Sequence, residues 1–86
     1  MFKKYRRINV AEMRPINEYD IDTFLCFDEI EVCIGDDKII VSISNEDKHN
    51  GSPKIGDMIA RNPENHKDQW LVAEKYCNAN FELIVE

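Results

Sequence analysis

The sequence has only three cysteines, and their spacing excludes two common kinds of small domain. The three cysteines are Cys26, Cys33 and Cys77. Their number is odd and no pair has CxxC spacing, so we expect neither a disulfide framework nor a zinc ribbon. His49 and His66 add no recognisable ligand spacing. We therefore expect no metal ion, and we expect the thiols to be buried or half-buried groups in a reducing compartment.

Glycine is equally scarce, which argues against a phosphate-binding loop. Gly35, Gly51 and Gly56 fall in separate turns and build neither the GxGxxG fingerprint nor a Walker loop. No serine has the context of a nucleophile elbow, and His66 and Asp68 lack a positioned nucleophile. We expect no catalytic site and no cofactor.

Long apolar runs are missing as well. No stretch approaches the roughly 18 apolar residues that cross a bilayer. The basic amino end is not followed by the apolar segment of a signal peptide. We expect one domain over residues 1–86, located in the cytoplasm and without a membrane partner.

Basic residues are absent from a long internal segment. Between residues 18 and 37 there is no lysine or arginine, but there are eight acids: Glu18, Asp20, Asp22, Asp28, Glu29, Glu31, Asp36 and Asp37. The net charge is −6, although residues 1–14 hold five basic residues against one acid. An acidic body repels phosphate backbones, which leaves nucleic acid only the basic strip Lys3, Lys4, Arg6 and Arg7. A basic protein partner, or pairing of this strip with the body, fits better. The alternative is a solvated face that maintains solubility.

Strand patterns dominate what is present. Residues 5–13 are rich in strand formers and predict a first strand that ends before Pro15. Residues 29–34 alternate strictly and predict a hairpin with residues 39–44 around a turn at 35–38. Residues 45–54 read as a polar loop. Further strands are expected over 58–61, 69–72 and 81–85, with a polar loop at 62–68.

Two segments carry helix signals. Residues 17–26 are ambiguous between a loop that leads to a strand and a short helix with Asn17 as its cap and Ile21, Phe24 and Leu25 inward, and we favour a short helix or turn. Residues 73–80 suit a helix of about two turns, with Ala73, Tyr76 and Cys77 on one face and Asn80 at its carboxyl end.

These elements predict an α+β fold, a small bent antiparallel sheet or partly open barrel with one or two short helices. Exposed hairpin edges make a homodimer reasonable. The expected core residues are Ile8, Val10, Ile30, Val32, Ile34, Ile40, Val41, Ile43, Ile59, Trp70, Val72, Tyr76, Phe81 and Ile84.

The polar loop before Trp70 is the first candidate binding site. Its side chains offer many hydrogen-bond donors and acceptors: Arg61, Asn62, Asn65, His66, Asp68 and Gln69. Exposed polar loops beside an aromatic residue often carry recognition. The alternative is that the Asn and Asp side chains bond to the loop's own backbone, with Trp70 in the core.

Several motifs resemble a family of small uncharacterised bacteriophage and prophage proteins. They are KYRR at 4–7, VSIS at 41–44, GSPK at 51–54, GDMIARNP at 56–63, DQWLVA at 68–73 and NFE at 80–82. The resemblance covers roughly the last half of the chain and its beginning, and it implies a phage origin without an established activity. Residues 17–40 depart from the family's pattern and look like an elaboration that carries whatever is particular to this protein.

We therefore expect a non-catalytic phage accessory protein that binds and inhibits a host defence or toxin protein. Glu29 and Glu31, on one face of the hairpin, are the acidic contact candidates. Two carboxylates on a face are too few for the regular rows that imitation of DNA phosphates needs. The alternatives are a small-ligand or nucleotide-binding domain that uses the Arg61–Trp70 loop, and RNA binding through the basic strip.

Overall fold

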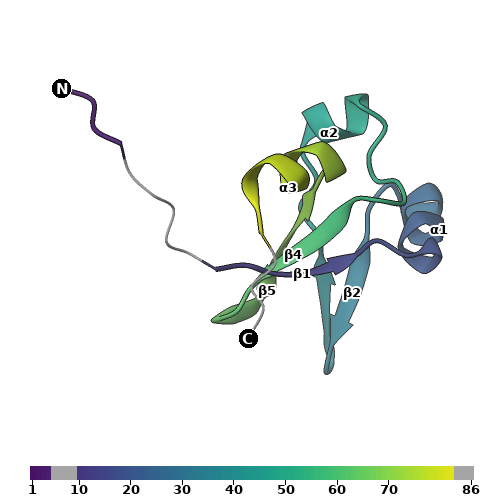
Figure 1. The fold of residues 1–86 in the computed structure, drawn as a ribbon. Coiled ribbons are helices and arrows are strands. Elements are labelled where there is room, and N and C mark those ends of the chain that lie inside the picture. Colours follow the sequence, from purple (N-terminus) through teal and green to yellow (C-terminus); the bar gives the residue numbers. More distant parts are fainter. Residues whose placement is uncertain (5–9, 83–86) are drawn as a thin grey trace.

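The structure of the chain is a computed structural model that describes residues 1–4 and 10–82. Its elements in chain order are β1 (Glu12–Pro15), α1 (Glu18–Phe27), β2 (Glu31–Ile34), β3 (Asp37–Ile40), α2 (Asn45–His49), β4 (Met58–Asn62), β5 (Asn65–Val72) and α3 (Glu74–Asn80). The strands form an antiparallel sheet of order β1-β4-β5 and a separate β2-β3 hairpin (Figure 1). The expected α+β class is confirmed, and the described strands form no closed barrel.

The first strand is displaced from its predicted position. β1 begins at Glu12 and includes Pro15, which lies opposite Met58 on β4. Proline is tolerated there because β1 is an edge strand and needs no N–H on its outer side. Val10 lies outside the strand and is 57% exposed, so its prediction as a core residue is wrong. Residues 5–9, Ile8 included, are outside the described residues.

The predicted β2-β3 hairpin is confirmed, with a tighter turn and two shorter strands, since β2 begins at Glu31 rather than at Glu29 and β3 ends at Ile40. Gly35 and Asp36 form the turn, and Gly35 has a φ of 61°, which glycine adopts without steric cost. β3 ends at Ile40 because the chain then crosses to the other sheet. The Ser42 N–H donates to the Gln69 carbonyl at 3.0 Å, and the Leu71 N–H donates to the Ser42 carbonyl at 2.8 Å. Ser42 thus joins the hairpin segment to β5.

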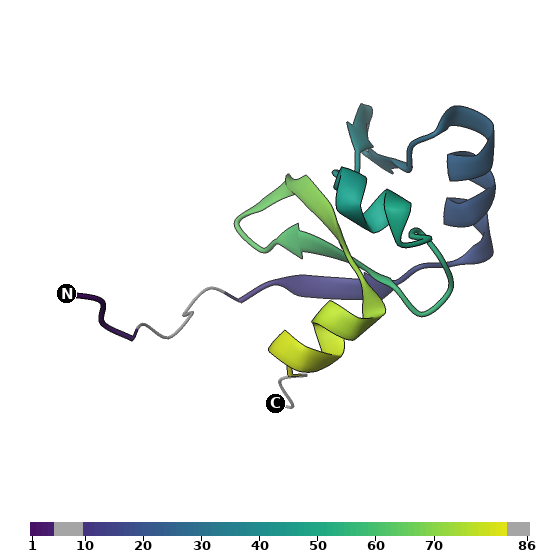
Figure 2. The same cartoon turned by 90° about the horizontal axis from the view of Figure 1, so that it is seen from above.

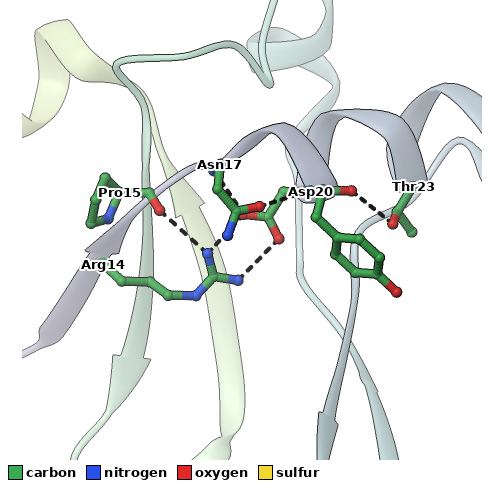
Figure 3. A network of polar contacts seen from close by, with 6 residues as sticks. Arg14, Pro15, Asn17, Asp20 and Thr23 are labelled. Atoms are coloured by element: carbon green, nitrogen blue, oxygen red, sulfur yellow. Dashed lines mark hydrogen bonds and ion pairs between the residues drawn. The ribbon is translucent and has the colours of Figure 1, made fainter.

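The helix α1 is confirmed, and a capping box begins it. The Asp20 N–H donates to the Asn17 side chain at 2.9 Å, and the Asn17 N–H donates to the Asp20 carboxylate at 3.0 Å. Asp20 is only 2% exposed, and its carboxylate also accepts hydrogen bonds from both terminal nitrogens of Arg14, at 2.7 and 3.0 Å (Figure 3). Burial by itself would raise the pKa of Asp20, but the bonds from Arg14 and Asn17 outweigh it and lower that pKa. This contact ties α1 to β1.

The helix α2 replaces part of the polar loop predicted at 45–54. Ser44 caps it, accepting a hydrogen bond from the Asp47 N–H at 3.1 Å. Acids in its first turn and Lys48 and His49 in its last turn match the helix dipole. Lys48 also links α2 to α1, because its ammonium lies 5.8 Å from the Phe24 ring centroid and 3.6 Å from the Asp28 carboxylate.

The helix α3 is confirmed over Glu74–Asn80, and the buried carboxylate of Asp57 holds its first residue. Asp57 is fully buried and accepts four hydrogen bonds, from the Ser52 hydroxyl at 2.7 Å, the Lys54 N–H at 3.0 Å, the Lys54 ammonium at 3.3 Å and the Glu74 N–H at 2.9 Å. Burial opposes ionisation, yet these donors lower the pKa of Asp57. Gly56 precedes Asp57 with a φ of 108°, and an added Cβ would meet the Glu74 carboxylate.

The hydrophobic core lies between α1, the hairpin and the larger sheet. It consists of Ile16, Ile30, Val41, Ile59 and Leu71, flanked by half-buried Ile21, Phe24, Val32 and Ile43. Ile30, Val41, Ile59 and Val72 are buried as predicted. The half-buried members of the predicted core are Val32, Ile34, Ile43, Trp70 and Phe81.

Other core predictions are wrong. Ile40 is 52% exposed and Tyr76 51% exposed, and Leu25 turns outward from α1 with 75% exposure. The predicted strand 81–85 falls mostly on residues 83–86, outside the described part of the chain together with Ile84, and Phe81 caps α3 instead.

The thiols are less buried than expected. Cys26 and Cys33 are exposed and Cys77 is half-buried, and all three are free. Within residues 1–4 and 10–82, no group of three or more His, Cys, Asp or Glu side chains is placed to hold a metal ion.

Candidate functional site

The predicted recognition loop is a tight β4-β5 hairpin rather than a seven-residue loop. Arg61 and Asn62 end β4, and Asn65, His66, Asp68 and Gln69 lie on β5. Only Pro63 and Glu64 form the turn, and a register shift at Arg61/Asn62 lies beside it. The sequence suggests a loop here because the first residues of β5 are exposed on both faces. They therefore show no alternation of apolar and polar side chains, which is the usual signal of a strand.

Much of this hairpin's polarity is used within the hairpin. The Asn62 side chain accepts from the Glu64 N–H at 2.9 Å, and the Asn65 side chain accepts from the Lys67 N–H at 3.2 Å. The Gln69 amide, buried to 7% exposure, donates to the His66 carbonyl at 3.0 Å. These contacts fit the interpretation in which side chains satisfy the local backbone.

Arg61 and His66 converge on a residue that the sequence did not single out, Glu12 of β1. The Arg61 Nε lies 2.9 Å and the His66 Nε2 lies 3.4 Å from one Glu12 oxygen. Arg61 also lines a groove of about 360 Å³ with Glu12, Arg14 and Gln69. Lys67 is likewise paired, with Asp37 at 2.7 Å. Binding by Arg61, Asn62, Asn65, His66, Asp68 and Gln69 stays a prediction.

A second surface has a different character. We define the α1 surface as the outward residues Glu18, Tyr19, Asp22, Leu25, Cys26 and Phe27. Three of them are large apolar side chains with high exposure, Tyr19 at 73%, Leu25 at 75% and Phe27 at 66%. The capping box and Arg14 fix Asp20 inward, which turns Ile21 and Phe24 to the core and leaves Leu25 outside. Both views place α1 at the edge of the molecule, beside α2 and away from α3 (Figures 1 and 2).

The acids around the α1 surface divide into paired and unpaired groups. Four of the eight acids between residues 18 and 37 have a basic partner: Asp20 with Arg14, Asp28 with Lys48, Glu31 with Lys38 and Asp37 with Lys67. Within the described part of the chain, the four others form no ion pair: Glu18, Asp22, Glu29 and Asp36. Two of these lie on the α1 surface and Glu29 follows its carboxyl end. The predicted contact residue Glu31 is therefore partly neutralised, and Glu29 is not.

Half of the basic strip lies among the described residues. Lys3 and Lys4 are exposed, whereas Arg6 and Arg7 lie outside the described residues. None of the helices formed by residues 10–82 combines the length and the apolar character of a membrane span.

Comparison of the chain with protein-family models, with curated proteins and with solved structures gives no match.

Proposed function

We propose that this protein is a non-catalytic binding domain that engages a basic partner protein through the α1 surface. The observation that carries the proposal is the exposure of Tyr19, Leu25 and Phe27 on one ten-residue helix, among acids that have no basic partner in the described part of the chain. Large exposed apolar side chains carried by one short helix mark it as a candidate interaction surface.

The composition of the α1 surface suits an interface with a defined partner chemistry. Aromatic and aliphatic side chains supply most of the binding free energy when they become desolvated at the centre of an interface. Glu18, Asp22 and Glu29 surround them with negative charge, which attracts a positively charged partner and repels an acidic one. The expected partner is a protein that presents an apolar pocket within a basic surface.

The resemblance to small phage proteins supports a host protein as that partner. In this proposal the protein acts in the cytoplasm of the host cell, where it covers the functional surface of a defence or toxin protein and inhibits it. The acidic segment that departs from the family's pattern contains the whole of α1. The surface that we propose to select the partner therefore lies in the part of the chain that is particular to this protein.

The two competing functions are favoured less by the contacts. A nucleotide or RNA phosphate needs available cationic groups, but Arg61 is paired with Glu12 and Lys67 with Asp37. Exposed Lys3 and Lys4 keep RNA binding as a competing outcome. A nucleotide panel that raised the melting temperature would favour the ligand alternative.

The test is affinity capture from nuclease-treated host lysate with matched variants. We expect one basic protein to be retained by the natural sequence and lost, by at least tenfold, with Leu25→Ser/Phe27→Ser. Ile55→Ser removes an equally exposed apolar side chain outside the α1 surface and should leave capture unchanged. Urea unfolding of each variant confirms that it is folded.

A second pair of variants separates charge from apolar contact. Glu18→Gln/Asp22→Asn should weaken capture and its sensitivity to salt, whereas Glu64→Gln/Asp68→Asn should not. Equal capture by all variants, or loss of capture only when nuclease is present, would contradict the proposal.

A further inference from the structure

A hollow of about 780 Å³ is lined by residues of α2, the end of β5 and α3. Its lining includes Glu46 and Asp47 from α2, Trp70 from β5, and Tyr76 from α3. No residue of α1 lines it. Its volume is within the range of sites that hold small molecules or single side chains.

The aromatic part of the lining has unused polar groups. Trp70 is half-buried and Tyr76 is 51% exposed. In the described residues, neither the Trp70 indole N–H nor the Tyr76 hydroxyl has a hydrogen-bond partner. An indole or phenol ring that borders a hollow offers a π face to a cation.

The charges of the lining favour a cation over an anion. The Lys54 ammonium is neutralised by Asp57 at 3.3 Å, which leaves Lys75 as the one lining cation without an ion pair in the described part of the chain. The carboxylates of Glu46 and Asp47 likewise form no hydrogen bond or ion pair with any described residue, since Asp47 takes part in the caps of α2 through its backbone N–H and carbonyl groups and not through its carboxylate. Two available carboxylates therefore face one available ammonium, on a protein whose net charge is −6.

We infer that this hollow is a binding site for an organic cation, a guanidinium or alkylammonium group on an apolar stem. The cationic head contacts Glu46 and Asp47, and the stem lies against Trp70 and Tyr76. The same chemistry occurs in a free cationic molecule and in an arginine or lysine side chain of a protein. The inference does not rest on the α1 surface, which shares no residue with the hollow.

Trp70 is the only tryptophan, so its fluorescence reports on this site directly. We would titrate the full chain with agmatine, with N-acetyl-arginine amide (called argininamide from here on), with the neutral N-acetyl-citrulline amide and with AMP. The two guanidinium compounds should change the fluorescence with saturation, and the citrulline compound should bind at least tenfold more weakly. Equal binding of the citrulline compound, or preferred binding of AMP, would overturn the inference.

Variants identify the groups responsible. Glu46→Gln/Asp47→Asn should weaken argininamide binding about tenfold, since each exposed charge pair contributes a few-fold. Glu64→Gln/Asp36→Asn removes the same charge from two turns outside the hollow and should have no effect. Lys75→Gln should leave argininamide binding equal or tighter, whereas an anion site would lose affinity. No effect of the Glu46/Asp47 pair would also overturn the inference.

The source of the cation follows from the relative affinities. Agmatine binding as tight as argininamide binding indicates a free cationic molecule, and tighter binding of argininamide indicates a protein side chain. Both results uphold a cation site. Urea midpoints within error of the natural sequence show that a weakened variant is folded.

Discussion

Asp57 is the residue on which the most local structure depends. Its buried carboxylate fixes the Ser52–Lys54 segment and the first N–H of α3 at once. In Asp57→Asn, an amide NH₂ group replaces one of the two carboxylate oxygens. At least one backbone N–H that now donates to Asp57 would then face another donor and lose its hydrogen bond. An unpaired buried donor costs about 1–3 kcal/mol, so we expect a loss of about 3 kcal/mol in the free energy of unfolding. Urea unfolding followed by circular dichroism measures it.

Asp68→Asn is the matched control for this prediction. The Asp68 side chain is exposed and makes no hydrogen bond or ion pair in the described residues, so the change should alter the free energy of unfolding by less than about 0.5 kcal/mol. Equal effects of the two substitutions would show that Asp57 does not organise this region.

The buried acids also determine how stability depends on pH. The pKa values of Asp20 and Asp57 are lower in the folded chain than the value of about 3.9 typical of unfolded Asp. Below that value the unfolded chain binds more protons than the folded one, so their contribution to stability is complete above about pH 5 and lost as pH falls through the folded pKa values. We expect the urea midpoint to fall steeply between pH 5 and pH 2.

Asp20→Asn tests the origin of this pH dependence. The variant is less stable at pH 7 but has one fewer depressed carboxylate to protonate, so its midpoint should fall less on acidification than that of the natural sequence. A fall as steep as that of the natural sequence would contradict the assignment. Asp68→Asn again serves as the control.

Residue-level predictions from sequence succeeded where local chemistry decided the outcome. Asn17 was identified as a cap because capping depends on a few neighbouring residues. Asp20 was counted only as a charge and Asp57 only as part of the motif at 56–63, since sequence does not show burial. Their partners Arg14 and Glu74 lie 6 and 17 residues away along the chain.

At the scale of elements, the cap of α1 decides whether the α1 surface keeps its shape. Asn17→Ala removes one half of the capping box, and such changes cost about 1 kcal/mol. We expect that loss in urea unfolding, together with faster amide exchange in α1. Asn78→Ala, within exposed α3, is the control and should be neutral or slightly stabilising because alanine favours helices. Unchanged exchange in α1 would contradict the role given to Asn17.

The elements were predicted best where their pattern was long or regular. The β2-β3 hairpin and α3 followed from alternation and from helical spacing. α2 was missed because five residues are too few for a helical period, although Ser44 followed by Asp47 is a cap signal. β1 was misplaced because its position depends on pairing with β4, a contact far away in the sequence.

At the scale of the whole molecule, the α+β class followed from the order of strand and helix patterns. The division into two sheets did not, because it depends on Ser42 crossing to β5. The candidate site also changed, from the predicted loop at residues 61–69 to the α1 surface, and this change depends on contacts that the sequence does not show. The hairpin of residues 61–69 uses much of its polarity internally, whereas the outward turn of Leu25 follows from Asp20 being held by Arg14.

The two proposed sites lie on different parts of the molecule. Figure 2 shows α1 at the edge of the molecule and away from α3. The hollow is lined by residues of α2 and α3 and by none of α1. Binding at one site does not cover the residues of the other, so their variants can be measured independently.

The most direct test of the α1 surface is site-specific photo-crosslinking in host cells. Benzoylphenylalanine is placed at position 25, on α1, or at position 64, in the β4-β5 turn. We predict that position 25 forms one covalent adduct with a basic host protein, that Glu18→Gln/Asp22→Asn reduces it, and that position 64 forms none. An adduct at position 64 alone, or equal adducts at both positions, would contradict the central claim that α1 contacts the partner.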